Sequence, residues 1–127
     1  MLIVEDNGRL LLALHNFLRA AFPGIEFRDV MDGEGALAAC KFAKPDLVLM
    51  DKCLPDADGI ELTAHLRTLY PGIGVIVMSY RTEAVYAKYA LTAGACAYIS
   101  KDRIDTELVP AIAAAIGIPA ARDIGAC

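Results

Sequence analysis

The sequence predicts a doubly wound α/β fold, a three-layer (βα)5 sandwich whose parallel sheet has the strand order 2-1-3-4-5. The first observation is that short β-rich runs alternate with longer segments of helical period along the whole chain. The second is that the runs 47–50 and 73–78 read as parallel strands that are apolar throughout and buried on both faces. The third is that 127 residues with 57% hydrophobic content suit one domain with a substantial core.

The first two strand–helix units are expected before Pro45. A strand at 2–4 precedes Asn7, which can cap a helix that ends at Pro23-Gly24. The apolar residues of that helix follow the i, i+3, i+4 spacing, namely Leu10, Leu11, Leu14, Phe17, Leu18 and Ala21. The next strand, 25–30, alternates apolar and polar residues as an edge strand does, and a second helix is expected around residues 36–40.

Three further units are expected in residues 47–116. The helix after strand 47–50 carries Leu62, Leu66 and Leu69 on one side, and a weaker helix at 84–91 follows strand 73–78. After a short strand at 96–99, Pro110 removes one backbone donor from the last helix, so we expect the regular part of that helix on its C-terminal side. Residues 1–116 are therefore predicted as one domain and 117–127 as a C-terminal tail.

Charge and composition exclude several classes of function. The 12 basic and 16 acidic residues give a net charge of −4 without a basic cluster, so we expect no nucleic-acid binding by this chain alone. No apolar run has the length of a membrane span and no basic leader opens the chain, so we expect no membrane partner and a cytoplasmic location. Four cysteines without a C-x-x-C pair indicate free thiols, and His15 and His65 lack the spacing of zinc ligands.

Side chains that can carry chemistry follow four of the predicted strands. Glu5 and Asp6 follow the first strand, Asp51 the third, Ser79 the fourth and Lys101 the fifth. Because ligands bind such sheets at the carboxyl ends of the strands, we expect these groups in one crevice. Converging carboxylates repel one another unless their pKa values rise or a divalent cation neutralises them. Oxygen ligands without a histidine or thiol cluster favour Mg²⁺, which binds carboxylates together with a phosphate oxygen, so the site predicts a phosphoryl ligand.

A resemblance to a known family rests on four runs of sequence: LIVEDN at 2–7, PDLVLMDKCLPDADGIEL at 45–62, VIVMS at 75–79 and AYISKD at 97–102. Over nearly its whole length the chain resembles the receiver domain of a two-component response regulator, which has the CheY-like form of the flavodoxin-like fold. The joint spacing is more specific than any single run, with 45 residues from Asp6 to Asp51, 28 from there to Ser79 and 22 more to Lys101.

The resemblance implies that Asp51 is the phosphoacceptor for a sensor histidine kinase. It also implies that Glu5, Asp6, Asp51 and the backbone carbonyl of Cys53 hold Mg²⁺. Positioning and charge stabilisation suffice for such a transfer, so we expect a switch that assists its own phosphorylation and dephosphorylation and is otherwise no enzyme.

Three more roles follow from the resemblance. Ser79 is the hydroxyl that turns toward the phosphoryl oxygens, Lys101 is their cationic partner, and Tyr98 changes rotamer on activation. The helix at 84–91, the strand at 96–99 and the last helix then form the readout surface, which is a candidate face for a homodimer.

Several positions lie outside these roles or depart from the family pattern. Asp102 follows Lys101 where the family has proline, and because a non-proline cis bond costs about 2.5–4 kcal/mol we expect a trans bond. The first strand is short and is expected to lose sheet hydrogen bonds. We assign Asp56 and Asp58 to loop solvation and Gly59 to a backbone position that tolerates no side chain.

Rival functions have recognisable requirements. A degenerate receiver that binds partners without phosphorylation remains the main alternative, although all acceptor residues are present. A haloacid-dehalogenase-like phosphohydrolase needs a second acid where this chain has Cys53, and a flavodoxin-type carrier needs a phosphate loop where Glu5 and Asp6 stand. The sequence around Asp51 and Ser79 is similar to receivers attached to LuxR/NarL-type DNA-binding domains. We therefore expect either a stand-alone receiver or one part of a DNA-binding regulator whose output domain is outside these residues.

Overall fold

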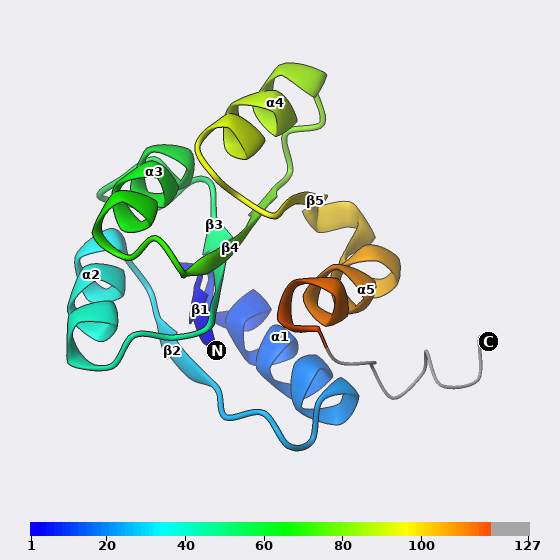
Figure 1. Ribbon diagram of the computed structural model, residues 1–127. Helices are drawn as coiled ribbons and strands as arrows, with labels where there is room; N and C mark the ends of the chain where they lie inside the picture. The colour runs from blue at the N-terminus through cyan, green and yellow to red at the C-terminus, as the bar shows by residue number, and fades with distance from the viewer. Residues whose placement is uncertain (118–127) are drawn as a thin grey trace.

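The computed structural model describes residues 1–117, in which five strands alternate with five α-helices (Figure 1). The strands are β1 (Leu2–Val4), β2 (Arg28–Val30), β3 (Leu47–Asp51), β4 (Gly74–Ser79) and β5 (Ala97–Ser100). The helices are α1 (Gly8–Ala21), α2 (Gly33–Phe42), α3 (Gly59–Leu69), α4 (Ala84–Thr92) and α5 (Ile104–Ile116), and the 3₁₀ turn η1 (Lys101–Arg103) precedes α5. Residues 118–127, which make up most of the predicted tail, lie outside the described residues.

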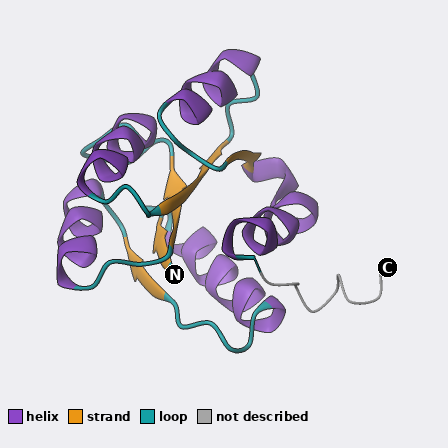
Figure 2. Ribbon diagram, in the orientation of Figure 1, coloured by secondary structure: helices purple, strands orange, loops and turns teal. Residues whose placement is uncertain are grey.

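The sheet has the order β2-β1-β3-β4-β5, which confirms the predicted fold class. Every strand pair in it is parallel, and Figure 2 shows the strands between the helices. The short β1 pairs with β2 and β3 over its residues Leu2 to Val4. The central strand β3 is buried along its whole length, as its run of apolar residues predicts.

Successive strand residues face two separate cores. Ile3 and Leu49 pack on one face with side chains of α1 and α5, whereas Val4 and Met50 pack on the other face with α2, α3 and α4. Figure 1 shows the same division of the helices around the sheet. Because both faces are covered, the ends of the strands are where a ligand can approach the sheet.

Local signals set the helix ends. The Asn7 side chain caps α1 as predicted, accepting hydrogen bonds from the N–H groups of Arg9 and Leu10 at 3.0 and 3.2 Å. Helix α4 buries only Ala90 and has no side-chain cap at its start. The chain leaves α4 through Gly94, whose φ of +105° disfavours any other residue.

Three predictions about these elements need correction. Strand β2 begins at Arg28 instead of residue 25, because the Ile25 N–H donates to Phe22 in the turn after α1. Helix α5 runs through Pro110 from Ile104 to Ile116, so the proline does not confine it. Leu69 is 50% exposed and does not belong to the buried side of α3.

Other expectations are confirmed within residues 1–117. The bond between Lys101 and Asp102 is trans, since this part of the chain contains no cis peptide. Cys40, Cys53 and Cys96 are free thiols, and Cys127 lies outside the described residues. None of the described helices combines the length and apolar character that crossing a bilayer requires.

Candidate functional site

Four strands deliver the predicted site residues to one edge of the sheet. Glu5 and Asp6 follow β1, Asp51 ends β3, Ser79 ends β4, and Lys101 opens the η1 turn after β5. One ligand oxygen from each of Glu5, Asp6 and Asp51 lies within 4.8 Å of the other two. The structure therefore brings together the side chains that the sequence placed at the strand ends.

These residues line a pocket of about 370 Å³, and Asn7, Tyr80 and Arg81 contribute to its walls. Glu5 is fully buried, Asp51 and Ser79 are each 2% exposed, and Asp6 is exposed. The pocket thus has a buried acidic floor and an open mouth. A small anionic group can reach Asp51 only if the charge of the floor is compensated.

Lys101 supplies part of that compensation. Its Nζ lies 2.8 Å from Glu5 Oε1 and 3.0 Å from Asp51 Oδ1, and only 7% of its side chain is exposed. One ammonium group thus serves two buried carboxylates. When both acids are ionised, the pair carries one negative charge that Lys101 does not neutralise.

The environment shifts the pKa values of both partners. Burial raises the pKa of Asp51, and the Glu5 carboxyl acts in the same direction, against the opposing effect of Lys101. Burial acts to lower the pKa of Lys101, but the Glu5 and Asp51 carboxylates outweigh burial and raise that pKa above its usual value. Lys101 is therefore firmly cationic at neutral pH.

The donor set fits a divalent cation. Glu5 Oε2 accepts the N–H of Asn7 at 3.1 Å, but among the described residues the buried Oε1 finds no hydrogen-bond donor of good geometry, despite the nearby ammonium of Lys101. A buried carboxylate oxygen beside two further carboxylates is a hard ligand of the kind that Mg²⁺ prefers. The Cys53 N–H donates to Asp51 Oδ1 at 3.1 Å, and the predicted role of the Cys53 carbonyl as a ligand stays a prediction.

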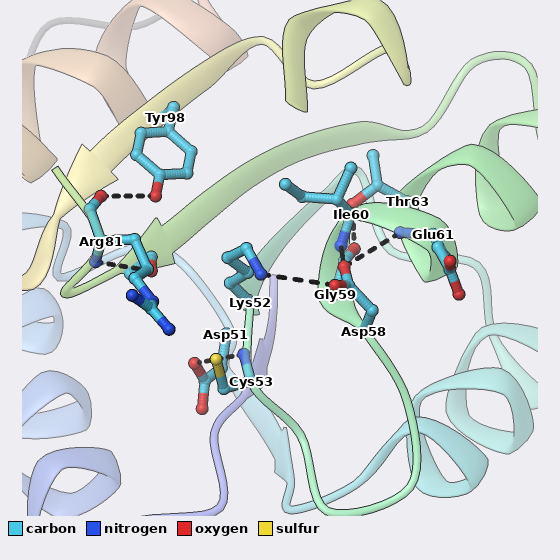
Figure 3. A network of polar contacts seen from close by, with 11 residues as sticks. Asp51, Lys52, Cys53, Asp58, Gly59, Ile60, Glu61, Thr63, Arg81 and Tyr98 are labelled. Atoms are coloured by element: carbon cyan, nitrogen blue, oxygen red, sulfur yellow. Dashed lines mark hydrogen bonds and ion pairs between the residues drawn. The ribbon is translucent and has the colours of Figure 1, made fainter. Parts of the chain in front are cut away.

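The loop after β3 folds back tightly on the strand (Figure 3). The Gly59 N–H donates to the Lys52 carbonyl at 2.6 Å, and Cys53 and Asp58 form an isolated antiparallel bridge. A Cβ at Gly59 would overlap the carbonyl oxygen of Asp51 and lie 2.8 Å from the Cα of Lys52. This close approach confirms that position 59 tolerates no side chain.

The assignment of Asp56 and Asp58 to loop solvation is wrong, because both carboxylates cap helices. Asp58 accepts the N–H of Ile60 at 2.8 Å at the start of α3. Asp56 reaches across to the start of α2, where it accepts the N–H groups of Gly33 at 2.7 Å and Glu34 at 3.0 Å. These two hydrogen bonds lower the pKa of Asp56 and tie the loop beside Asp51 to α2.

The residues predicted for switching share one partner, the backbone of Arg81, and Figure 3 shows the contact between Tyr98 and Arg81. Ser79 Oγ accepts the Arg81 N–H at 2.9 Å, and the Tyr98 hydroxyl donates to the Arg81 carbonyl at 2.6 Å. Tyr98 is outside the pocket lining, but this contact links it to the loop that follows Ser79. A movement of that loop therefore affects both side chains.

Tyr80 is a pocket residue that the sequence analysis missed. Tyr80 lines the pocket, and Lys101 Nζ lies 5.4 Å from the centroid of its ring. The available signal was its place directly after Ser79, at the carboxyl end of an inner strand. Nothing in the periodicity indicates that the ring meets Lys101, because the two residues are joined only through the folded sheet.

Comparison with known proteins agrees with this geometry. The family model described as the response regulator receiver domain matches residues 1–113. The chain is 38% identical over 101 residues to the transcriptional activator protein ExaE of Pseudomonas putida, and this match covers 80% of this chain and 47% of ExaE. It is 43% identical over 105 residues to the KDP operon transcriptional regulatory protein KdpE of Escherichia coli, and this match covers 80% of this chain and 44% of KdpE. The chain thus spans about half the length of these relatives.

Among solved structures, the chain is similar to a CheY-like response regulator receiver domain protein from Methanospirillum hungatei. The TM-score is 0.82 at 29% sequence identity, and the match covers 91% of each chain. The likeness thus extends over most of both chains.

Proposed function

The chain belongs to the response regulator receiver domain family, and from this premise we propose that Asp51 accepts a phosphoryl group from a sensor histidine kinase in a Mg²⁺-dependent transfer. The observation that carries the proposal is the position of Asp51. It is buried at the end of a central strand, beside two further acids and one lysine, in a pocket open to a phosphodonor. Like most domains of this kind it is a signalling domain rather than an enzyme.

The transfer needs little from the protein beyond position and charge. A carboxylate oxygen of Asp51 bonds to phosphorus, while the bond from phosphorus to the imidazole nitrogen of the donor breaks and that nitrogen keeps the electron pair. Lys101, 3.0 Å from Asp51, faces the negative charge that builds up on the phosphoryl oxygens. The Cys53 N–H holds Asp51 in place for the attack.

Mg²⁺ would be held by Glu5, Asp6, Asp51 and the Cys53 carbonyl, and when bound it supplies positive charge and orients the phosphoryl oxygens. Glu5 Oε1 is buried and finds no hydrogen bond of good geometry among the described residues, although the Lys101 ammonium lies 2.8 Å away, and this supports the ligand set. The chain's own contribution is to keep these oxygens in place without the ion, through the Asn7 and Lys101 contacts to Glu5.

Phosphorylation is then read out through the loop after β4. The Ser79 hydroxyl accepts a hydrogen bond from Arg81 and can donate its own hydrogen to a phosphoryl oxygen. Drawing Ser79 toward the phosphoryl group shifts the Arg81 peptide, and with it the hydrogen bond to Tyr98. The surface of α4, β5 and α5 changes as a result and serves as the contact face, including for a homodimer.

Because the relatives are transcriptional regulators about twice as long, we place this domain in a cytoplasmic regulator that controls transcription through a LuxR/NarL-type or other output domain. The receiver itself has no basic cluster and contacts protein partners, not DNA.

The test is incubation with acetyl phosphate and Mg²⁺ followed by intact mass spectrometry. Wild type is expected to gain the mass of one phosphoryl group, and Asp51→Asn none. Asp56→Asn is the matched control, since it neutralises an acid of the same loop outside the pocket lining. No gain in wild type would support the alternative of a degenerate receiver that acts without phosphorylation.

A further inference from the structure

Tyr86 lies in the first turn of α4 and is outside the lining of the pocket around Asp51. Its ring contacts two cations, with Lys52 Nζ 4.8 Å and Arg81 Cζ 5.8 Å from the ring centroid. Both distances are within the range of a cation–π interaction. Because α4 buries only Ala90 and has no side-chain cap at its start, these contacts help to attach its first turn to the loops after β3 and β4.

Lys52 stands directly between Asp51 and Cys53, which carry the phosphoacceptor and a proposed Mg²⁺ ligand. Its ammonium contacts the Tyr86 ring and also lies 3.3 Å from Asp58 Oδ2, and only 12% of its side chain is exposed. Figure 3 shows the contact between Lys52 and Asp58. The backbone N–H and carbonyl of Lys52 are hydrogen-bonded to β4 and to the start of α3. The Tyr86 ring thus contacts, from α4, the residue that joins Asp51 to Cys53.

Tyr89 on the same helix gives a matched comparison. Tyr86 is partly buried, whereas Tyr89 is 56% exposed. Among the described residues, the cation–π contacts of α4 all involve Tyr86 and none involves Tyr89. The two tyrosines therefore have the same side chain on one helix, and only Tyr86 contacts the loop that follows Asp51.

We infer that Tyr86 is a positioning residue for the metal site: by holding Lys52 in place from α4, it keeps Asp51 and the Cys53 carbonyl where they can bind Mg²⁺ together. This inference rests on the proposed function, because it takes the ligand set from there. Mg²⁺ demands near-octahedral geometry and few protein ligands bind it, so a small displacement of two of them weakens binding. Coupling between two sites is reciprocal, so Mg²⁺ in turn favours the contact between Tyr86 and Lys52.

The aromatic face is the part of Tyr86 that matters for this role, because the contact with Lys52 is made with the ring. Tyr86→Phe keeps the ring and is expected to keep the affinity for Mg²⁺. Tyr86→Leu keeps an apolar side chain of similar reach and removes the aromatic face. A cation–π contact of typical strength corresponds to a factor of about two to five in an equilibrium constant.

Lys52→Met tests the same contact from the other side. If Tyr86 acts through Lys52, adding Tyr86→Leu to Lys52→Met changes the affinity for Mg²⁺ no further, because the contact is already lost. An additional loss in the double variant as large as that of Tyr86→Leu alone would show that Tyr86 acts independently of Lys52. That result would overturn the inference.

The experiment measures Mg²⁺ binding to the unphosphorylated chain by isothermal titration calorimetry with magnesium chloride. Tyr86→Leu is expected to raise the dissociation constant about two to five times above that of wild type, with Tyr86→Phe and the control Tyr89→Leu close to wild type. An unchanged dissociation constant for Tyr86→Leu would overturn the inference, and so would an equal increase for Tyr86→Phe or for Tyr89→Leu.

A second measurement separates positioning of the metal site from a general loss of structure. The rate of labelling by acetyl phosphate is followed by intact mass spectrometry over a range of Mg²⁺ concentrations. Positioning predicts that Tyr86→Leu needs more Mg²⁺ to reach its half-maximal rate and attains the rate of wild type at saturating Mg²⁺. A lower rate at saturation, with an unchanged requirement for Mg²⁺, would refute the inference.

Failure of the proposed phosphoryl transfer gives a different result. In that case wild type takes up no phosphoryl group, but the calorimetric comparison of Tyr86→Leu with Tyr89→Leu still decides the role of Tyr86. A wild-type chain that binds no Mg²⁺ would refute both the proposed ligand set and the positioning role.

Discussion

Replacing Lys101 by methionine tests the electrostatics of the pocket. Lys101 is the cation shared by Glu5 and Asp51, at 2.8 and 3.0 Å, and the two carboxylate side chains are 0% and 3% exposed. Methionine keeps most of the length of the side chain and removes the charge. Two buried acids then face each other without a cation, which is the situation in which breaking a buried pair costs about 3–5 kcal/mol.

A second lysine gives the matched control. Lys52 Nζ lies 3.3 Å from Asp58, whose side chain is 40% exposed. Water screens a partner of that exposure, so Lys52→Met is expected to cost about 1 kcal/mol or less. The same substitution in one chain thus separates a buried pair from a partly exposed one.

The assay is urea unfolding at neutral pH in the presence of a chelator, so that no divalent ion replaces the lost charge. The loss of free energy of unfolding caused by Lys101→Met is expected to shrink as the pH falls. Burial and Glu5 already raise the pKa of Asp51, and once Asp51 is protonated its carboxyl no longer repels the neighbouring acid. The reasoning is refuted if Lys101→Met is no less stable than Lys52→Met, or if its deficit is independent of pH.

Three further predictions concern Asp51 and its loop. Gly59→Ala should lower the free energy of unfolding by about 1–3 kcal/mol in urea, because its Cβ meets backbone atoms, whereas Gly24→Ala, which has open space, should change it by less than about 0.5 kcal/mol; equal effects would contradict the close approach. Asp51→Asn should raise the thermal midpoint of unfolding at neutral pH. The pKa of Asp51 is raised in the folded state, so its contribution to stability is lost as the pH rises from 3.8 through the pKa of the folded state. A lower midpoint for Asp51→Asn would count against this reasoning. The pKa of Asp56 is lowered in the folded state, so its contribution to the free energy of unfolding is present above pH 3.8 and lost as the pH falls through the pKa of the folded state. Asp56→Ala should remove that part of the acid destabilisation, measured by urea titrations at several pH values. An unchanged dependence of stability on pH would argue against the helix cap.

The fold was predictable because local patterns and sheet rules agree. Strand β3 is apolar at positions 47–50 and buried on both faces. Asn7 has the side chain of a typical helix cap and caps α1 in the structure. The convergence of Asp6, Asp51 and Lys101 followed from one topological rule, that strand ends of a parallel sheet meet at one edge. These features need no knowledge of long-range side-chain contacts.

The predictions were wrong or incomplete where tertiary contacts determine the partner of a side chain or the extent of a helix. Asp56 caps a helix that begins 23 residues earlier in the chain, so no local motif reveals its partner Gly33. Pro110 lacks one N–H, but Leu108, Val109 and Ile112 are buried around it, and their packing keeps α5 continuous. The contact between Tyr80 and Lys101 likewise exists only once β4 and β5 are paired.

The most direct test of the central claim is to locate the phosphoryl group by peptide mapping of protein treated with acetyl phosphate. We expect one modified peptide, containing Asp51, that forms with Mg²⁺ and is strongly diminished by a chelator or by Glu5→Gln. Modification at another residue, or labelling of Asp51 that is indifferent to both the ion and Glu5, would contradict it.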